Sequence, residues 1–521
     1  MCPKPGGAHQ EARVTRSERF VTLGIMLGIF MASMESTVVA TAMPTIVSQI
    51  GGLASYSWVF SAYMLAATAT VPLFGKLSDL YGRRKVFAVA MGLFLTASLL
   101  CGLARSMPQL IAFRALQGLG AGGLLPLAFI MIGDMFTVER RARMQGLFSS
   151  MWGLSSIVGP LLGGFLVDRV SWPWVFYINV APGLLAAALI WRFFEADLAP
   201  GPARPTVDYV GAVLLTAGVV ALLLGLFELE GGRAAPRLAL AAGLFAALAW
   251  VERRAPDPVL PLQLFRLRLF AVACAQGLWS GWSMFGSLAF VPLFVQAVLR
   301  TSATAAGSTL TPMMLGWVSA SILSTRFLLL RLGYRVLALT GMVSLSTGTL
   351  LMTRVGPDAT RGYVMLAVTL MGIGMGLSVP SFMIAVQSTV SRRVLGAATS
   401  TLQFSRSIGG ALGISVMGAV LAARLAGALR AEGIDPGTVS VNRLLDLLAR
   451  AAAPALDGAL RAALAGAIQG IFVVALLAAL AALAVTMLAP GGRLALGPRP
   501  QDADAARPEP AGAVRPASAK P

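Results

Sequence analysis

One acidic residue lies inside a long apolar stretch of this chain. Glu35 follows an almost entirely apolar run from Phe20 to Met34. A helix that crosses the hydrocarbon core of a membrane needs about 20 apolar residues, and an ionisable group inside such a helix marks an ion pathway by default. Glu35 is therefore predicted to take up and release a proton within a membrane. The alternative is a structural carboxylate that pairs with a neighbouring helix.

Arg114 is the cation that we expect to face Glu35. It lies in the apolar range 110–133, which is predicted to run antiparallel to the first span, so both side chains fall in the outer half of the membrane. A neighbouring arginine favours the charged carboxylate, whereas burial favours the neutral one. These opposed effects would poise Glu35 for proton exchange. The alternative for Arg114 is a side chain that extends to the membrane interface.

The composition predicts that lipid surrounds most of the chain. Of the 521 residues, 57% are hydrophobic and 12% are charged, whereas soluble proteins carry about 25% charged residues. Basic residues cluster between alternate spans, which predicts that both termini are cytoplasmic and that the net charge of +19 does not reflect nucleic-acid binding. The fourteen predicted spans are 20–42, 57–75, 86–104, 110–133, 144–167, 174–194, 209–229, 237–251, 270–296, 305–325, 335–353, 362–387, 396–423 and 464–488.

Most other chemistry is disfavoured by the sequence. Cys2, Cys101 and Cys274 are isolated and His9 is the only histidine, so neither a disulfide framework nor a metal site nor a catalytic triad is expected. No phosphate-binding P-loop occurs. The range 118–123 reads Gly-x-Gly-x-x-Gly, but a dinucleotide site needs a preceding strand, and small residues in membrane helices serve close packing. We therefore expect no cofactor.

The order of spans predicts a division into two halves with an insertion. An even number of spans and weak internal echoes favour two bundles of six spans, as in secondary transporters whose substrate site lies between repeated halves. The predicted parts are an N-terminal tail (1–19), an N-terminal six-helix bundle (20–195), two inserted helices (196–260), a C-terminal six-helix bundle (261–490) with an external loop (424–463), and a disordered tail (491–521).

A glycine-bounded basic turn follows the second span. The range 75–85 combines two glycines, which permit unusual dihedral angles, with an aspartate that can cap a helix or pair with an arginine. Such a cluster could latch an inner gate. A plain positive-inside anchor is the alternative, but it would need neither the glycines nor the aspartate. The gating candidates are Gly75, Asp79, Gly82, Arg83 and Arg84.

The fifth span carries glycines on both sides of a proline. A proline removes a backbone hydrogen bond and bends a helix, and the flanking glycines allow close approach to neighbours. Ordinary packing through a Gly-x-x-x-Gly pair is the alternative. The residues concerned are Gly153, Gly159, Pro160, Gly163 and Gly164.

Polar and aromatic residues inside the spans are candidates for a substrate cavity. Aromatic and methionine side chains make adaptable walls that tolerate cations, although they also serve ordinary packing. A buried arginine could equally join two helices through backbone carbonyls. Tyr63 fits an interfacial aromatic belt. The cavity candidates are Gln117, Gln276, Trp279, Trp282 and Arg406.

Several of these stretches resemble motifs of one family. The range 75–85 resembles the cytoplasmic signature of the major facilitator superfamily, and 153–164 resembles its antiporter signature. The range 34–44 resembles the first-span motif of the fourteen-span drug:proton antiporters, with Glu35 where aspartate is usual. The ranges 172–179 and 396–413 resemble the sixth-span and thirteenth-span patterns of that subfamily.

The resemblance implies a major facilitator fold and a transport function. It implies a proton-coupled antiporter in the cytoplasmic membrane that exports amphipathic, cationic or mixed drugs by alternating access. The alternative is a dedicated exporter of one metabolite, such as an antibiotic or an amino acid. An enzyme is not expected. The expected partners are the substrate, protons and membrane lipid, without nucleic acid, and an accessory envelope protein is a partner that the sequence leaves open.

Overall fold

The computed structural model describes residues 16–50, 56–194, 208–227, 234–255, 258–260, 262–301, 305, 308–391, 394–431 and 454–491. These residues form helices and connecting turns without a strand, which confirms the predicted all-helical class. The first half contains α1 (Arg16–Ile50), α2 (Tyr56–Tyr81), α3 (Arg83–Gly102), α4 (Met107–Met135), α5 (Val138–Arg169), α6 (Trp174–Tyr177) and α7 (Val180–Phe193).

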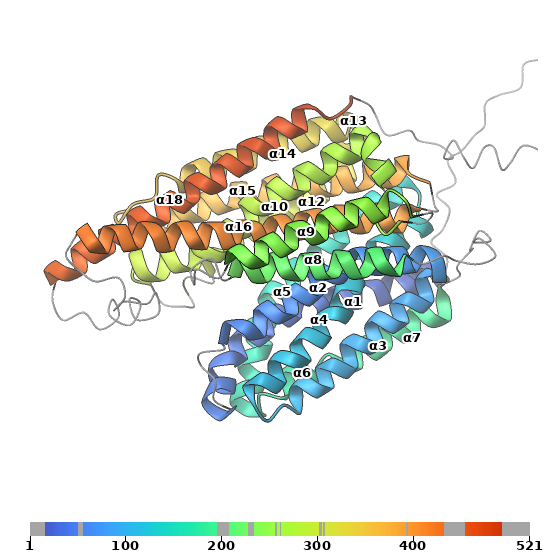
Figure 1. Ribbon diagram of the computed structural model, residues 1–521, viewed down its shortest axis with the longest axis horizontal. Helices are drawn as coiled ribbons and strands as arrows, with labels where there is room; N and C mark the ends of the chain where they lie inside the picture. The colour runs from blue at the N-terminus through green and yellow to red at the C-terminus, as the bar shows by residue number, and fades with distance from the viewer. Residues whose placement is uncertain are drawn as a thin grey trace, which may run out of the picture.

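Two helices lie between the first and second halves in the chain (Figure 1). The insertion contains α8 (Tyr209–Phe227) and α9 (Ala234–Glu252). The second half contains η3 (Leu262–Arg266), α10 (Arg268–Leu293), η4 (Phe294–Val298), α12 (Thr311–Leu323), η5 (Ser324–Leu328), α13 (Leu329–Leu332), α14 (Tyr334–Met352), α15 (Arg361–Thr389), α16 (Leu395–Ala431) and α18 (Pro454–Met487).

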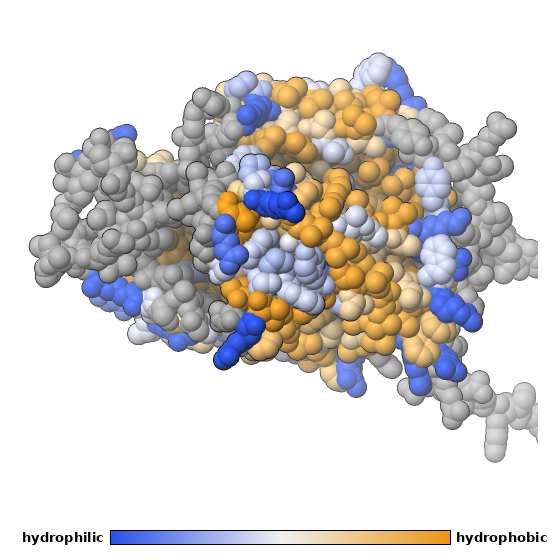
Figure 2. All heavy atoms as spheres, turned by 90° about the horizontal axis from the view of Figure 1, so that it is seen from below, coloured by the Kyte–Doolittle hydropathy of each residue, from blue (hydrophilic) through white to orange (hydrophobic). Residues whose placement is uncertain are grey.

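The helices are suited to a bilayer by length and by surface. Among the described residues, 11 helices are long and apolar enough to cross a membrane. Figure 2 shows hydrophobic residues across the middle of one face and hydrophilic residues gathered toward its ends. An outward-facing apolar surface of this kind is stable only in contact with lipid. The chain is therefore a multi-pass membrane protein.

Several helix ends differ from the predicted boundaries. α1 begins at Arg16, within the predicted tail, and α16 continues to Ala431, well past the predicted end of its span at 423. α18 begins at Pro454, before its predicted start at 464. A helix can extend beyond its apolar stretch because its backbone hydrogen bonds are formed within the helix itself. The range 432–453 of the predicted loop and the tails 1–15 and 492–521 lie outside the described residues.

The two halves share a glycine pattern in corresponding helices. In α4, a Cβ added at Gly118 or Gly122 would lie 2.4 Å from a backbone oxygen of α2. In α15, a Cβ added at Gly372 or Gly376 would lie 2.1 or 2.3 Å from a backbone oxygen of α12. These positions require glycine because the helix backbones touch. The packing of α4 on α2 is therefore repeated by the packing of α15 on α12.

The halves meet at one end of the bundle, which we call the basic end because Lys76, Arg83, Arg84 and Lys85 lie there. Between the halves, α2 packs on α16 and α5 packs on α12. In Figure 1 the halves converge at this end and diverge toward the other. The inserted helix α8 contacts both α2 and α16, so it covers the seam between the halves.

Candidate functional site

Glu35 and Arg114 form an ion pair inside the first half. An Nη1 atom of Arg114 lies 2.6 Å from Oε1 of Glu35, and the two residues are 0% and 1% exposed, respectively. Glu35 comes from α1 and Arg114 from α4, as expected for antiparallel neighbours. A charge buried at this depth requires a partner of opposite sign. The structure therefore brings together Glu35, which was predicted to exchange a proton, and Arg114, the cation predicted to face it.

Three short polar side chains complete the site. Asn179, in the turn between α6 and α7, donates from Nδ2 to Oε2 of Glu35 at 2.6 Å. Gln117 accepts from Arg114 at 2.6 Å and donates to Ser98 at 3.1 Å. Ser98 on α3 donates to the Phe176 carbonyl at 3.0 Å and also accepts from Asn179 at 3.2 Å. Both carboxylate oxygens of Glu35 are thus held by donors from different helices.

The remaining contacts of Arg114 come from α2. Its Nε atom donates to the Val59 carbonyl at 3.3 Å, and its guanidinium lies 4.2 Å from the centre of the Tyr63 ring. A guanidinium over an aromatic face is stabilised by the ring quadrupole. Arg114 therefore keeps favourable contacts that do not depend on Glu35. Tyr63, which the sequence places in an interfacial belt, lies in this site instead.

Sequence reasoning assigned no site role to Asn179 or Ser98. Asn179 belongs to a stretch noted only for its family resemblance, and Ser98 is an ordinary small polar residue of an apolar span. Oδ1 of Asn179 is buried without a hydrogen-bond partner among the described residues. A polar residue at the first turn of the sixth span was the available signal, since buried polar groups in membrane helices need partners.

Glycines of α4 set the distances in this site. Gly118 and Gly122 lie against the α2 backbone, while a Cβ at Gly120 would lie 2.5 Å from the backbone nitrogen of Phe94 on α3. α4 is therefore clamped between α2 and α3, which positions Arg114 and Gln117 on its buried side. The glycine-rich stretch is a packing device in a helix, and no strand precedes it within the described residues.

The fifth helix links this site to the second half. Ser155 of α5 lies 2.6 Å from Ser33 of α1, two residues before Glu35, and donates to the Phe30 carbonyl at 3.1 Å. On another side of α5, a Cβ added at Gly153 would lie 3.1 Å from Val318 of α12. The antiporter-helix candidates Gly159 and Gly163 are buried, Gly164 has open space beside it, and the side chain of Pro160 lies outside the described residues.

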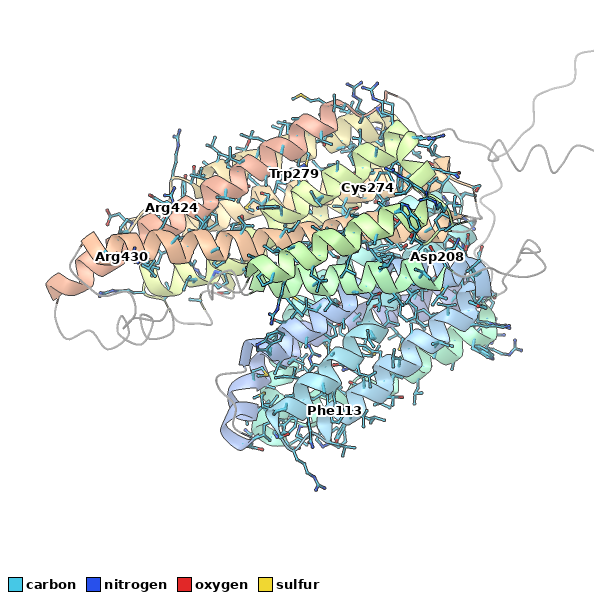
Figure 3. All side chains as sticks on the ribbon, viewed as in Figure 1. Phe113, Asp208, Cys274, Trp279, Arg424 and Arg430 are labelled. Atoms are coloured by element: carbon cyan, nitrogen blue, oxygen red, sulfur yellow. The ribbon has the colours of Figure 1, made fainter. Side chains whose placement is uncertain are left out.

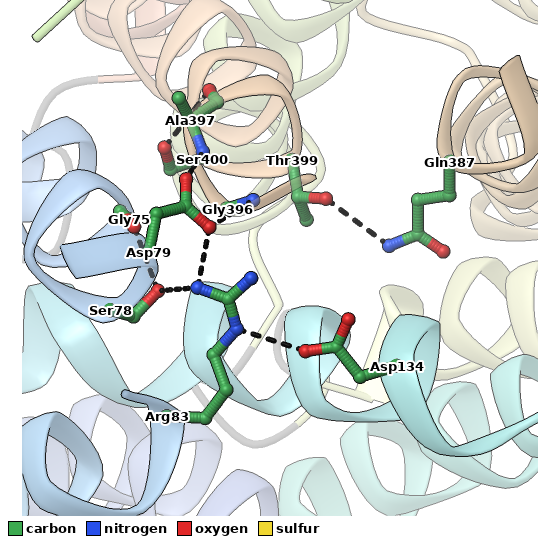
Figure 4. A network of polar contacts seen from close by, with 10 residues as sticks. All are labelled: Gly75, Ser78, Asp79, Arg83, Asp134, Gln387, Gly396, Ala397, Thr399 and Ser400. Atoms are coloured by element: carbon green, nitrogen blue, oxygen red, sulfur yellow. Dashed lines mark hydrogen bonds and ion pairs between the residues drawn. The ribbon is translucent and has the colours of Figure 1, made fainter. Parts of the chain in front are cut away.

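The predicted gating turn forms a bridge between the halves at the basic end (Figure 4). Asp79 of α2 accepts hydrogen bonds from the backbone N–H groups of Gly396 and Ala397, at 3.0 and 2.9 Å. These groups form the N-terminus of α16, where the helix dipole favours a negative charge. A Cβ at Gly75 would collide with Ser400 of α16. Asp79 therefore caps a helix of the opposite half.

Arg83 holds Asp79 in place. Its guanidinium lies 2.5 Å from Asp79 and 2.9 Å from Asp134 of α4. Gly82 starts the next helix with a φ of 89°, a conformation that favours glycine. Arg84 lies outside this bridge, with its guanidinium 4.9 Å from the centre of the Trp191 ring. The structure thus groups four of the five gating candidates.

The cavity candidates lie in three different environments. Gln117 belongs to the Glu35 site described above. Gln276 donates to Met342 and Ser378, so it lies among helices of the second half. Trp279 (Figure 3) and Trp282 lie with ring centres 5.7 Å apart and pack on the apolar core of that half. Arg406 lies on α16 and bonds to Gln403.

Sequence comparisons show that this chain is similar to membrane transporters. The model of the Major Facilitator Superfamily matches residues 25–414. The chain is 38% identical to the multidrug transporter protein MdtP of Bacillus subtilis (strain 168) over 421 residues, which are 80% of this chain and 77% of that protein. It is 40% identical to multidrug resistance protein 3 of the same organism over 411 residues, which are 78% of this chain and 80% of that protein.

Solved structures share the fold. The human organic anion transporter MFSD10 (TETRAN) superposes with a TM-score of 0.60 at 16% sequence identity, over 88% of this chain and 99% of that one. The proton:xylose symporter XylE superposes with a TM-score of 0.56 at 13% identity, over 88% and 94% of the two chains. At these identities the likeness concerns the arrangement of helices alone. The predicted fold class is confirmed.

Proposed function

Because this chain belongs to the major facilitator superfamily, we propose that it is a proton-coupled antiporter that exports amphipathic drugs or toxic compounds across the cytoplasmic membrane. The multidrug relatives, at 38% and 40% identity, support the substrate class. The resemblance of the fifth helix to the antiporter signature supports the direction. The proposal includes cytoplasmic termini, a cytoplasmic basic end, and no enzymatic reaction.

The observation that carries the proposal is the buried Glu35–Arg114 pair. A proton on Glu35 removes the negative charge of the pair, and the ion pair becomes a hydrogen bond from a charged donor to a neutral carboxyl group, which is weaker. Arg114 can remain buried because Gln117, the Val59 carbonyl and the Tyr63 ring still contact it. The site can therefore exist in two protonation states without a large rearrangement of α4.

A change at Glu35 can reach the contact between the halves through α1 and α5. The Ser33–Ser155 bond joins the two helices close to Glu35, and α5 packs on α12 of the second half. Loading or loss of the proton thus shifts a helix that touches both halves. Alternating access needs such a link between the ion site and the interface on which the halves rock.

The conformation is one in which the basic end is closed by Asp79 and α16. Under the proposed orientation the cytoplasmic entrance is shut and the opposite side is the one from which substrate leaves. Opening toward the cytoplasm then requires the Asp79 hydrogen bonds to Gly396 and Ala397 to break. The proposal therefore assigns the inner gate to this bridge.

The test is Glu35→Gln in purified protein reconstituted into proteoliposomes with an imposed pH gradient. Glutamine has nearly the same volume and still accepts from Arg114, but it cannot lose a proton. We expect gradient-driven transport of fluorescein, rhodamine 123 and ethidium to fall to background, while exchange of dye without a gradient persists. Glu18→Gln, an acidic change at the start of the same helix, is the control. Normal gradient-driven transport by Glu35→Gln would contradict the proton assignment.

A further inference from the structure

Arg406 is a cation in the middle of a membrane helix. It lies roughly 16 Å along α16 from Leu395, at about 1.5 Å per residue, which is near the centre of a hydrocarbon core of about 30 Å. A charge at this depth is costly unless it has a partner or faces an aqueous space. Arg406 therefore requires an explanation that the proton site does not give.

The structure gives Arg406 no acidic partner. Among the described residues, its only side-chain hydrogen bond runs from Nη2 to Oε1 of Gln403, and no carboxylate lies within ion-pair distance. Its remaining nitrogens, Nε and Nη1, are absent from the buried polar atoms that lack a partner, so they keep accessible surface. Nε and Nη1 thus keep hydrogen-bonding capacity that no described residue uses.

The orientation of Arg406 follows from its neighbours on α16. Its stem rests on α10, where a Cβ at Gly281 would lie 3.2 Å from Cγ of Arg406. Ser400, on a different side of α16, contacts Gly75 of α2. Gln403 projects between these two sides, and the Arg406 guanidinium is turned toward it. The Arg406 side chain therefore lies on the side of α16 between its contacts with α10 and α2, where the two halves of the protein adjoin.

The charge balance at this depth is positive. The carboxylate of Glu35, inside the first half, is neutralised by Arg114. Asp79 and Asp134 are held by Arg83 at the basic end. Arg406 therefore has no opposite charge beside it among the described residues at this depth, and a ligand placed there meets a cation rather than an anion.

We infer that Arg406 binds an anionic group of the transported molecule, so that the exporter accepts amphipathic compounds that carry a carboxylate or sulfonate. Transport of such a compound rests on the proposed function, whereas its binding at Arg406 does not. An arginine suits planar two-oxygen anions because its donors form a fixed fork. The inference departs from the cationic substrates that the family resemblance suggested.

Equilibrium binding tests the inference directly. Fluorescein and rhodamine 123 share a xanthene ring system, but the first is an anion and the second a cation. Fluorescence anisotropy with the purified protein in nanodiscs should show tighter binding of fluorescein. Arg406→Gln should weaken fluorescein binding by about tenfold or more, as expected for loss of a charge-assisted hydrogen bond, and should leave rhodamine 123 binding unchanged or tighter. Arg406→Lys should keep part of the preference.

The control is Arg430→Gln, which removes an exposed cation near the other end of α16 (Figure 3). It should change neither binding constant. Equal affinity of wild type and Arg406→Gln for fluorescein, an equal loss for both dyes, or a wild-type preference for rhodamine 123 would overturn the inference. If the wild type binds fluorescein through Arg406 but a pH gradient drives neither dye, the proposed function fails and the anion site stands.

Discussion

The two halves of the molecule use the same backbone packing to carry different chemistry. Four residues before the first packing glycine, α4 has Arg114 and α15 has Val368; one residue before it, they have Gln117 and Met371. All four side chains are buried. The helices around them adopt the same arrangement, with glycines against neighbouring backbones. The repeated scaffold is therefore independent of the ionic site that one half contains.

The turns at the basic end also share a backbone conformation and differ in their polar residues. Gly82 and Gly333 start α3 and α14 with φ values of 89° and 81°. Three residues before each glycine the first half has Asp79 and the second has Leu330, which is 37% exposed. The conformation of the turn is common to both halves, whereas of these two described turns only the one with Asp79 bridges to the opposite half. Glycine thus specifies shape here, and the polar residues specify the function of the half.

The largest loss of stability is expected when Arg114 is replaced by valine, the residue at the corresponding position of α15. Arg114→Val leaves the Glu35 carboxylate buried without its cation, and the free energy of unfolding should fall by about 3–5 kcal/mol. Thermal unfolding in detergent measures this. The double variant Glu35→Gln, Arg114→Val should recover most of the loss because no buried charge remains.

Met371→Leu in α15, three residues after Val368, is the control change in the second half. It conserves side-chain volume, and it should cost less than about 1.5 kcal/mol. If Arg114→Val is no less stable than Met371→Leu, the two halves do not differ in their dependence on a buried charge.

An intermediate effect is expected from the feature that the halves share. A Cβ at Gly122 or Gly376 would lie 2.4 or 2.3 Å from a backbone oxygen of the neighbouring helix, and a backbone cannot move aside locally. Gly122→Ala and Gly376→Ala should each lower the free energy of unfolding by about 1–3 kcal/mol, measured as above. Gly92→Ala, with open space beside it, should be neutral or stabilising. A loss in only one half would break the proposed equivalence.

The smallest effect is expected at the bridge. Asp79→Asn keeps one acceptor but removes the charge at the α16 N-terminus, which should shift the protein about tenfold toward states with an open basic end. Double electron–electron resonance between spin labels at Lys85 and Arg266, both exposed, measures the population of these open states.

Leu330→Asn is the positional counterpart in the second half. It should leave the distance distribution unchanged because Leu330 forms no bridge to the first half among the described residues. Equal shifts in both variants would mean that the label distance reports general loosening.

The sequence predicted the all-helical membrane fold and the Glu35–Arg114 encounter because both depend on hydropathy and span direction. It did not predict Asn179 or Ser98, since the rotation of each helix about its own axis decides which small polar residues face inward. It predicted that Asp79 could cap a helix or pair with an arginine, but it did not identify α16 as the helix that Asp79 caps. Backbone N–H groups at a helix start have no side-chain signature, and only the packing of α2 against α16 brings them within reach.

The choice of backbone groups as the partners of Asp79 has an evolutionary consequence. Ala397 could be replaced by almost any residue whose backbone fits the helix start without loss of its N–H group, whereas Gly396 is fixed by its contact with Gly75. If the proposed roles hold, positions further along α16 such as Arg406 can change under selection for new compounds while the Asp79 contact at the basic end is preserved. Point mutations in such a transporter could then give the cell resistance to a new toxin without altering the contact at the basic end.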